Sequence, residues 1–484
     1  MNDGPNSFLW HDYETFGADT RRDRPVQFAA LRTNADLAVI GEPTVIYCQP
    51  ADDVLPHPDA CLITGITPQL ACERGLPENQ FAARIHALMS EPGTCSVGYN
   101  NFRFDDEVTR FLFWRNFFEP YAREYSNGNS RFDLIDLMRM TAALRPDGLS
   151  WPLRDDGSPS FRLEDLAAAN GMDTSRAHDA LADVEATLGL ARLLRQHQPR
   201  LWDWALSLRH KHVVTGLLNR GEPLLHSSSR LPASQFATAP VLPVAPHPDF
   251  AGQWVVWNLN IDPAPFLDLP DEMLSDLLWT PSADLPEEME RLPVKLIRAN
   301  RCPMISPLSV LNEDSRKRLG IDIHAVNEHS ERLRRSASFS ERLGKLFSSN
   351  PAKDNDPELA LYDGFVPRGD QAVMARVRSL DASALASLGQ PFQDERLNTL
   401  LFRYRARHFP DALTDEEREA WQQWRRQRLI DDPELASIRW PEFQQRINEL
   451  KGTHRDRQDL WTALLDWART LGLPTKSEND NSMS

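Results

Sequence analysis

The chain has 484 residues, of which 41% are hydrophobic and 26% charged, as in ordinary globular proteins of two to four domains. Its net charge of −16 argues against a protein that coats DNA non-specifically. Its five cysteines have no paired spacing, which argues against a disulfide framework or a zinc site, and no apolar run approaches the ~18 residues of a membrane span. We therefore expect a cytoplasmic protein without a leader or a membrane segment.

Up to about residue 198 the chain alternates strand-like and helix-like segments. Strands are predicted where β-branched and aromatic residues alternate with polar ones, and helices where apolar residues recur every three or four positions. The expected strands are 8–14, 26–33, 42–48 and 94–100, and the expected helices are 78–89, 105–118, 161–171 and 177–197. This order predicts an α/β domain over residues 1–198, with a mixed central sheet flanked by helices.

The pattern changes after residue 199. A Pro-rich stretch and the expected strands 253–262 and 293–305 predict a smaller β-rich domain over residues 199–350. The polar stretch 348–358 resembles a linker. Amphipathic helices expected at 396–409, 415–430 and 459–471 predict a helical domain over residues 355–475, and residues 476–484 are expected to form a disordered tail.

Basic residues gather in five short groups, at 209–212, 316–318, 332–335, 403–408 and 425–428. Each group alone is typical of a solvated helix face. Together, the groups beyond residue 300 are expected to form walls that hold a nucleic-acid strand.

Two carboxylates, Asp12 and Glu14, end the first predicted strand. A strand rises ~3.3 Å per residue and alternates faces, so the two side chains would point the same way, roughly 6.6 Å apart. Like charges on one face repel unless a cation lies between them. This spacing therefore predicts a site for a divalent cation.

Further groups for such a site lie at Asp105, at an expected helix start, and at His178 and Asp183, five residues apart. Two divalent ions about 3.5–4 Å apart can stabilise the attacking and leaving oxygens of a phosphoryl displacement, and Mg²⁺ or Mn²⁺ prefers carboxylate ligands. Histidine, which ordinarily titrates near pH ~6.5, suits the base that activates water. Because five helical residues turn through ~500°, His178 and Asp183 share the site only if His178 lies at the frayed start of its helix.

Each motif alone is weak. A D-x-E in a strand is usually a solvated edge, and the "HD" at 178–179 is also found in HD-type phosphohydrolases, although the second upstream histidine of that fold is not evident. Taken in chain order, however, the acids and the histidine form the signature of the DEDDh 3′→5′ exonucleases, which have an RNase H-like fold.

A more specific resemblance covers nearly the whole chain. The segments "HDYETFG", "DRPVQFAALRT", "GYNNFRFDDEVTR" and "SFRLEDLAAANG", and later "PVKLIRANRCP", "LYDGF" and "LLFRYRARHFP", resemble the bacterial exodeoxyribonuclease I family. The resemblance implies an RNase H-like exonuclease domain, an SH3-like β-barrel domain and an α-helical C-terminal domain. It also implies processive, two-metal-ion 3′→5′ degradation of single-stranded DNA to nucleoside 5′-monophosphates, in DNA repair and recombination.

The resemblance also implies roles for individual residues. Asp12, Glu14 and Asp183 bind two Mg²⁺ ions (or Mn²⁺), Glu14 also contacts substrate, Asp105 completes the acidic set, and His178 is the general base. Arg162 is a substrate contact, and a salt bridge to Glu164 or Asp165 is its structural alternative. Further expected DNA contacts are Arg110, Tyr121, Tyr125, Arg139 and Lys211, whereas the phenylalanines between residues 111 and 118 are expected to be mostly core.

The family resemblance implies one protein partner, the acidic C-terminal tail of single-stranded-DNA-binding protein. Such a tail needs a basic residue for its terminal carboxylate and an apolar wall for its last side chain. Arg145 and Trp204 stand at the matching positions, although Trp204 replaces a more usual tyrosine and is as well explained by a place in the core. The protein is expected to be a monomer.

Two alternative functions remain open. One is a DEDDh exonuclease with an RNA or proofreading substrate, but those proteins end soon after the helix that carries the histidine and the last aspartate. The other is a catalytically silent scaffold that binds single strands. A complete set of acids and a histidine argues against a scaffold, which would gain nothing from repelling charges.

Overall fold

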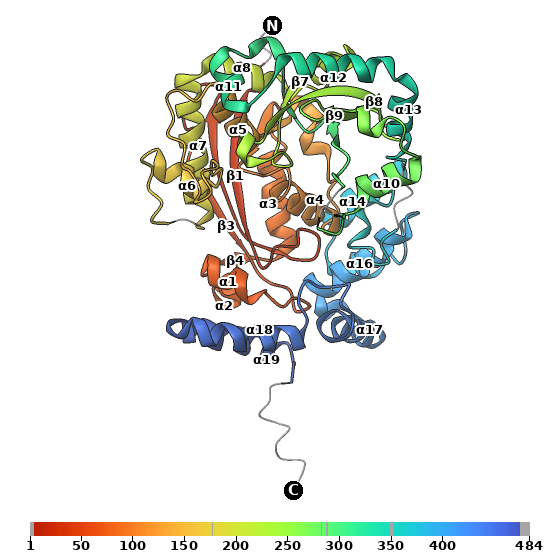
Figure 1. Cartoon of the computed structure of the whole chain (residues 1–484). Coiled ribbons are helices and arrows are strands. Elements are labelled where there is room, and N and C mark those ends of the chain that lie inside the picture. The colour runs from red at the N-terminus through yellow and green to blue at the C-terminus, as the bar shows by residue number, and fades with distance from the viewer. Residues whose placement is uncertain (1–3, 177, 282, 287–288, 349–352, 475–484) are drawn as a thin grey trace. The chain divides into compact units, whose positions relative to one another are not determined.

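The computed structural model describes residues 4–176, 178–281, 283–286, 289–348 and 353–474 (Figure 1). They form two compact units: the first contains residues 4–129, 176, 178–185 and 353–474, and the second contains residues 130–175 and the described residues between 186 and 348. The C-terminal residues therefore belong to the same unit as the N-terminal ones. The expected tail, 476–484, lies outside the described residues. No helix in the described ranges is long and apolar enough to cross a membrane.

A mixed sheet forms the centre of the first unit, as predicted. The strands that this unit contributes follow the order β4-β3-β2-β1-β5. Their bounds are β1 (Ser7–Thr15), β2 (Pro25–Asn34), β3 (Thr44–Cys48), β4 (Gly75–Leu76) and β5 (Thr94–Gly98). β1 pairs antiparallel with β2 and parallel with β5, so it has a neighbour on both sides. The two-residue strand β4 was not predicted, because so short a segment has no alternation to read.

Helices α1 (Pro58–Thr64) and α2 (Pro68–Arg74) lie between β3 and β4 in the sequence, α3 (Glu78–Met89) lies between β4 and β5, and α4 (Asp105–Arg115) follows β5. Leu9 and Phe28 of the sheet pack with Phe81 of α3 and Leu112 of α4 in one buried core. Helix α3 has its predicted bounds. Helix α4 ends three residues early because Phe117 has a φ of 59°, a left-handed conformation that cannot continue a helix.

The C-terminal part of the first unit is helical, as predicted. Its main helices are α14 (Arg368–Ser379), α15 (Ala382–Ala386), α16 (Glu395–His408), α17 (Asp415–Arg426), α18 (Trp440–Thr453) and α19 (Gln458–Thr470), and short helical turns lie at η6 (Ala360–Tyr362), η7 (Pro410–Ala412), η8 (Gln427–Asp431) and η9 (Arg455–Arg457). Figure 1 shows α18 and α19 beside α1 and α2, and Phe16 and Trp461 lie in the core that joins these segments. A second core joins Phe111 and Trp114 of α4 to Leu400 of α16. The N-terminal and C-terminal segments therefore bury each other's apolar residues.

Buried ion pairs join the same two segments. Arg407 Nη2 donates to Asp53 at 2.6 Å and to Glu358 at 2.5 Å, and Arg24 Nη2 donates to Glu358 at 2.6 Å. Arg403 makes a bidentate pair with Asp356 at 2.7 and 2.9 Å. Arg428 is also buried, with its guanidinium 3.7 Å from both Asp53 and Glu358.

These ion pairs correct two expectations. Arg403, Arg407 and Arg428 form neither a solvated face nor a wall for a nucleic-acid strand, because their guanidiniums are buried against carboxylates. The expected linker 348–358 is only partly described, and its described end is buried at Asp356 and Glu358.

The second unit begins with β6 (Ser130–Asp133), α5 (Leu134–Leu144) and α6 (Leu163–Ala169). Helix α7 (Ala180–His197) starts in the first unit and continues into the second, followed by α8 (Pro199–Ser207) and α9 (Lys211–Asn219). An amphipathic pattern predicted α6 and α7 to within three residues at each end.

A second, wholly antiparallel sheet confirms the β-rich part of the prediction. Its order is β10-β9-β8-β7-β11, with bounds β7 (Leu224–Ser227), β8 (Thr238–Pro246), β9 (Gln253–Asn258), β10 (Val294–Arg298) and β11 (Met304–Pro307). The single strand expected at 293–305 is therefore two strands, because the backbone turns between them and Cys302 has a φ of 41°.

Helices and short turns complete the second unit. They are η3 (Ala233–Gln235), η4 (Ala264–Phe266), α10 (Asp271–Trp279), η5 (Leu308–Val310), α11 (Glu313–Leu319), α12 (Ile323–Arg335) and α13 (Ala337–Lys345). The five cysteines form no disulfide with one another in the described residues, and four of them are buried.

Candidate active site

Strand β1 holds the first two acids of the site. Residues 12 and 14 share one face of the strand, while His11 and Tyr13 on the opposite face are buried at 2% and 3% exposure. The Tyr13 ring packs against Phe28 with ring centroids 4.9 Å apart. This packing fixes the register of β1, so the half-buried Asp12 and Glu14 side chains must point away from that core.

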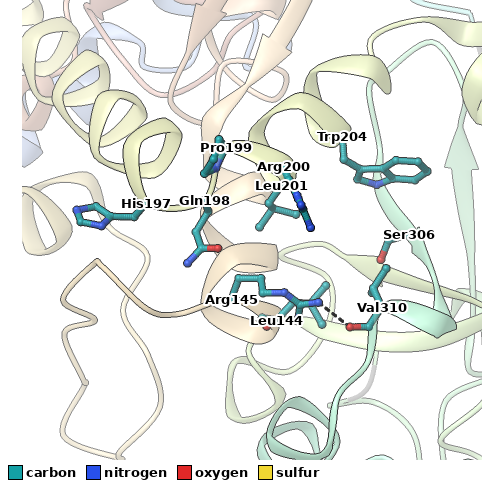
Figure 2. A pocket seen from close by; sticks show the side chains of 10 residues that line it. All are labelled: Leu144, Arg145, His197, Gln198, Pro199, Arg200, Leu201, Trp204, Ser306 and Val310. Atoms are coloured by element: carbon teal, nitrogen blue, oxygen red, sulfur yellow. Dashed lines mark hydrogen bonds between the residues drawn. The ribbon is translucent and has the colours of Figure 1, made fainter.

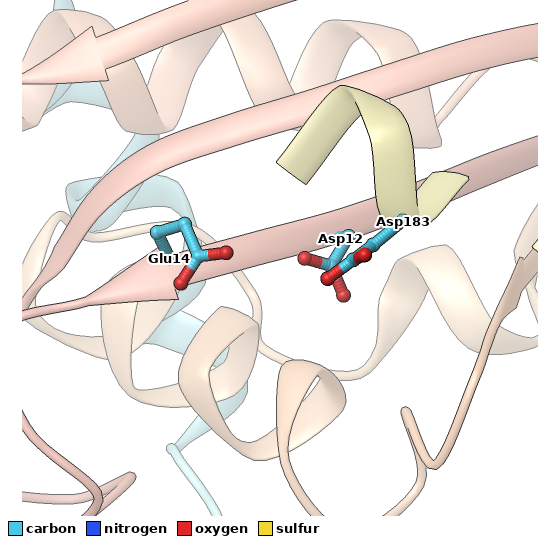
Figure 3. Close-up of side chains that lie close together, drawn as sticks. All are labelled: Asp12, Glu14 and Asp183. Carbon is cyan, nitrogen blue, oxygen red and sulfur yellow. The ribbon is translucent and has the colours of Figure 1, made fainter. Parts of the chain in front are cut away.

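The third acid, Asp183, lies in the first turn of α7. Each of Asp12, Glu14 and Asp183 offers a carboxylate oxygen within 4.8 Å of the other two (Figure 3). Asp183 is thus brought beside two acids that lie 171 and 169 positions earlier in the sequence, Asp12 and Glu14, as the pattern of acids predicted. These three residues are called the acidic triad below.

Asp105 lies beside the triad, but its carboxylate is not one of the three whose oxygens lie within 4.8 Å of one another. It is the first residue of α4, it is 2% exposed, and its Oδ1 accepts a hydrogen bond from the Tyr13 backbone N–H at 3.1 Å. Thr109 Oγ1, one turn further along α4, lies 3.0 Å from the Tyr13 hydroxyl. Asp105 is therefore tied to the strand that carries Asp12 and Glu14.

The acids raise one another's pKa values. Burial raises the pKa of Asp12 well above its ordinary range, and the charges of Asp105, Glu14 and Asp183 raise it further. Burial, followed by the charges of Asp183, Asp105 and Asp179, raises the pKa of Glu14 to about 8. So many carboxylates are unfavourable together unless a cation neutralises them. The donor set consists of hard oxygens alone and fits a divalent metal ion.

His178 lies in a turn two residues before α7 begins, which meets the condition set by the helical geometry. Its side chain is exposed, and its backbone φ of 67° is uncommon for a residue other than glycine. Its neighbour Ala177 lies outside the described residues.

Asp179, which sequence reasoning missed, accepts a hydrogen bond from Ala182 N at 3.1 Å and adds negative charge near Glu14. An aspartate just before an Ala-rich run is typical of a helix start, and this pattern could have identified Asp179 from the sequence.

The predicted DNA contacts of the first unit differ in exposure. Tyr125 is 67% exposed. Arg110 is 4% exposed and bonds to Glu124 at 2.8 and 3.1 Å and to Glu107 at 2.6 Å. Its guanidinium lies 5.3 Å from the ring centre of the half-buried Tyr121. Arg110 thus belongs to an internal ion network.

The predicted DNA contacts of the second unit also differ in how exposed their side chains are. Arg162 precedes α6, its side chain is 67% exposed, and it pairs with Glu164 at 2.5 Å, the alternative that the sequence left open. Arg139 is 9% exposed, pairs with Asp136 at 2.5 Å and lies 5.7 Å from the Phe161 ring centre. Lys211 is exposed at the start of α9.

Arg145 and Trp204 line one cavity of about 490 Å³ in the second unit (Figure 2). Arg145 donates to the Leu144 carbonyl at 2.6 Å and to the Val310 carbonyl at 2.9 Å. Trp204 is half-buried, and its indole N–H donates to the Ile305 carbonyl at 2.9 Å. The remaining lining residues are Leu144, His197, Gln198, Pro199, Arg200, Leu201, Ser306 and Val310.

Family models match three consecutive stretches of the chain. Residues 9–191 match an exonuclease model, residues 209–349 the exonuclease I SH3-like domain, and residues 355–471 the exonuclease I C-terminal domain. The matches account for the mixed sheet, the antiparallel sheet and the C-terminal helices in that order.

Known proteins resemble the chain over nearly its whole length. Exodeoxyribonuclease I of Escherichia coli strain K12 is 42% identical, over 97% of this chain and 100% of its own. The structure of exonuclease I from Methylocaldum szegediense matches with a TM-score of 0.92 and 46% identity, over 96% of this chain and 99% of its own. A zinc-bound complex of E. coli exonuclease I with single-stranded DNA matches with a TM-score of 0.90 and 41% identity, over 97% of this chain and 100% of its own.

Proposed function

Because the chain belongs to the exodeoxyribonuclease I family, we propose that it removes nucleotides processively from the 3′ end of single-stranded DNA and releases nucleoside 5′-monophosphates. The chain is an exonuclease by that membership, and a relative bound to single-stranded DNA supports the substrate. The observation that carries the proposal is the acidic triad, with its ligand atoms within 4.8 Å of one another. DNA repair and recombination are the processes in which such an activity is used by the family.

For the metal we propose two Mg²⁺ ions, which Mn²⁺ could replace. Asp12, Glu14 and Asp183 would hold them, and Asp105 would complete the set from α4. When bound, such ions neutralise charge on the scissile phosphate and make a bound water more acidic. Carboxylates from β1 and α7 are held by packing in the sheet and by the helix start, so their arrangement does not depend on a flexible loop.

His178 is the proposed general base, which accepts a proton from the attacking water at an imidazole nitrogen. Its exposed position is compatible with access to water, and its place two residues before α7 keeps it close in sequence to Asp183. Asp179, which accepts a hydrogen bond from the start of α7, would hold the turn between them.

Contacts to DNA are proposed at two kinds of position. The exposed Arg162, Lys211 and Tyr125 are suited to direct contact with phosphates or bases. Arg110, Arg139 and Tyr121 are buried or half-buried, and a phosphate would have to compete with Glu124 or Asp136 for the two guanidiniums. Of these two kinds we expect the exposed positions to contribute more to binding.

The cavity lined by Arg145 and Trp204 is proposed to bind the C-terminal tail of single-stranded-DNA-binding protein. The cations of Arg145 and Arg200 suit a carboxylate, and the Trp204 ring and Leu201 offer an apolar wall. Replacement of Arg145 by alanine should weaken binding of an acidic peptide with a free C-terminal carboxylate, measured by fluorescence anisotropy. An amidated peptide should bind weakly to both proteins.

Three further properties are proposals: the domain boundaries, the monomeric state and the cytoplasmic location. The domains are assigned to residues 1–198, 199–350 and 355–475, which the family matches at 9–191, 209–349 and 355–471 support. The protein is proposed to act as a monomer in the cytoplasm. Its five cysteines, which form no disulfide with one another in the described residues, are compatible with a reducing compartment.

One assay tests the proposed activity directly. Purified protein is given 5′-labelled single-stranded DNA, duplex DNA and RNA of one sequence, with Mg²⁺ and with EDTA. We expect rapid shortening of the single-stranded DNA from its 3′ end with Mg²⁺ and no shortening with EDTA. Preferential digestion of RNA would favour the alternative exonuclease, and binding without digestion would favour the scaffold.

A further inference from the structure

A buried ion pair adjoins Asp105 in the first unit. Arg123, in the short turn η1 (Ala122–Glu124), donates from Nη2 to Asp106 Oδ1 at 2.5 Å, and neither side chain of the pair has any exposed surface. Asp106 is the second residue of α4 and directly follows Asp105. The chemistry proposed for the acids and His178 uses neither member of this pair.

Stability alone does not explain the pair between Arg123 and Asp106. Taking two charges out of water costs about as much as their attraction returns, so a buried ion pair is often no more stable than two apolar residues of the same volume. A guanidinium and a carboxylate, however, bond to each other in only a few orientations. What the pair offers beyond packing is therefore a defined orientation of Asp106 and of the helical turn that carries it.

The first turn of α4 is held on two sides. Successive helical residues point about 100° apart around the helix axis, so Asp105 and Asp106 face different neighbours. Asp105 Oδ1 accepts a hydrogen bond from the Tyr13 backbone N–H at 3.1 Å. Asp106 N donates to the Asn101 carbonyl at 2.8 Å, while the Asp106 carboxylate is held by Arg123. A rotation of the turn that broke the contact to Arg123 would also move the Asp105 carboxylate.

Both members of the pair keep their charge. Burial opposes the charge on Arg123, but Asp106, followed by Glu124, outweighs burial and raises the pKa of Arg123. This matters for the site because Asp105 already repels Asp12, whose pKa it helps to raise. A carboxylate on the next residue without a cation would add to that repulsion, and Arg123 neutralises it.

The same pair acts on strand β1. His11, the residue before Asp12 in that strand, is 2% exposed. Burial, followed by the charge of Arg123, lowers the pKa of His11 to about 3, whereas the charge of Asp106 opposes this shift. The pair is therefore close to both β1 and α4, the two elements that carry Asp12, Glu14 and Asp105.

We propose that Arg123 is a positioning residue: through its ion pair with Asp106 it holds the first turn of α4 and keeps Asp105 in place beside the acidic triad. The proposal rests on the proposed function and adds to it the support behind Asp105. Residues that orient the groups of a metal site are important for its function, and their replacement typically costs about 10–100-fold in metal affinity or activity.

The test measures metal binding apart from DNA binding. Mn²⁺ is titrated into the full-length wild type, Arg123→Met and Arg123→Lys by isothermal titration calorimetry, at a temperature at which circular dichroism shows each protein to be folded. Arg123→Met should bind Mn²⁺ about 10–100-fold more weakly than the wild type. Arg123→Lys keeps the charge but not the planar guanidinium, so it should lose less. Affinity for 5′-labelled oligothymidylate in EDTA should stay close to that of the wild type, because the pair is buried away from solvent.

Arg115→Met is the matched control. Arg115 is the last residue of α4, is 3% exposed, and donates from Nε and Nη2 to Glu78 at 3.2 Å in each case. Its replacement also breaks a buried ion pair of α4, but at the end of the helix that is far from Asp105. Arg115→Met should therefore bind Mn²⁺ as the wild type does, whereas a loss due to general destabilisation would be seen in Arg115→Met as well.

Hydrolysis and a double variant give further readouts. In Mg²⁺, Arg123→Met should lower kcat on single-stranded DNA and leave KM nearly unchanged. Asp106→Asn should also weaken Mn²⁺ binding, and Asp106→Asn combined with Arg123→Met should lose no more than the worse single variant, because both residues act through one contact.

Three results would overturn the positioning role of Arg123: unchanged Mn²⁺ affinity in Arg123→Met, an equal loss in Arg115→Met, or losses that multiply in the double variant. If Arg123→Met does not fold, Arg123→Lys and Asp106→Asn are judged against Arg115→Met by the same criteria. Digestion by the wild type is scored separately. A wild type that does not digest single-stranded DNA in Mg²⁺ would contradict the proposed function, whereas a wild type that digests it no faster than Arg123→Met would contradict the positioning role alone.

Discussion

The repulsion within the acidic triad predicts that one conservative substitution stabilises the metal-free protein. Glu14 has a pKa raised from 4.5 to about 8, first by burial and then by the charges of Asp183, Asp105 and Asp179. A carboxyl whose pKa is higher in the folded state binds a proton more tightly there than in the unfolded chain. Stability therefore falls as the pH rises from about 4.5 to about 8. Glu14→Gln removes this titration.

The magnitude follows from the pKa. Each pH unit in that window contributes about 1.4 kcal/mol for one proton, so the upper limit for Glu14 is on the order of 5 kcal/mol. Because the acids titrate together and Asp12 also retains a proton more tightly, we expect a measured gain of about 1–3 kcal/mol at pH 8. The gain should be small near pH 5, where Glu14 is protonated in the folded protein.

The assay is thermal or urea unfolding in EDTA between pH 5 and pH 9 for the wild type, Glu14→Gln and the control Glu73→Gln, which changes an exposed residue of α2. The wild type and Glu73→Gln should lose stability with pH more steeply than Glu14→Gln. Adding Mg²⁺ or Mn²⁺ should stabilise the wild type and have much less effect on Glu14→Gln. Parallel pH profiles for Glu14→Gln and the wild type would refute the reasoning.

Three further predictions concern the base and the joined segments. His178→Ala should lower turnover by about 10²–10⁴-fold, with partial recovery at high pH as hydroxide replaces the base, and unchanged steady-state kinetics would make His178 structural. Glu358→Gln should cost about 3–5 kcal/mol in urea unfolding at pH 7, because it leaves the buried Arg24 and Arg407 without a shared carboxylate. Those arginines hold the pKa of Glu358 well below its usual range despite burial. The loss of unfolding free energy in Glu358→Gln should therefore become smaller as the pH falls toward the lowered pKa of Glu358 in the folded protein. A chain ending at residue 200 should fail to give a cooperative melt by circular dichroism, because Phe16, Phe111 and Trp114 would lose the C-terminal residues that bury them; a sharp melt would contradict this.

Local patterns predicted strands β1, β2, β3 and β5 of the first sheet, but not β4, and they placed two acids of the triad, Asp12 and Glu14, on one face of β1. The alternation of β1 decides which side chains share a face, and this placed Asp12 and Glu14 together before any long-range contact was known. To place His178 relative to Asp183, one must know at which residue α7 begins, and periodicity alone leaves that residue uncertain by a few positions. Asp179, at that start, was missed for the same reason.

The basic groups show where sequence reasoning fails. Arg403 and Arg407 lie in a dense run of cations, which is typical of a solvated face, yet both are buried against Asp356, Glu358 and Asp53. Asp53 lies some 350 residues earlier in the chain, and no local pattern indicates such a pairing. Arg110 is likewise held by Glu124 and Glu107 rather than left free for a phosphate. The sign of a charged run is visible in the sequence, but the partners that neutralise it are set by tertiary packing.

The most direct test of the acidic triad is a comparison of hydrolysis and binding in Asp183→Asn. This variant changes one ligand oxygen of the three that lie within 4.8 Å and keeps the size of the side chain. Shortening of 5′-labelled single-stranded DNA in Mg²⁺ should be abolished, while affinity for the same DNA in EDTA should stay within a few-fold of the wild type. Near-normal hydrolysis by Asp183→Asn in Mg²⁺ would contradict the assignment of the triad as the metal site of the exonuclease.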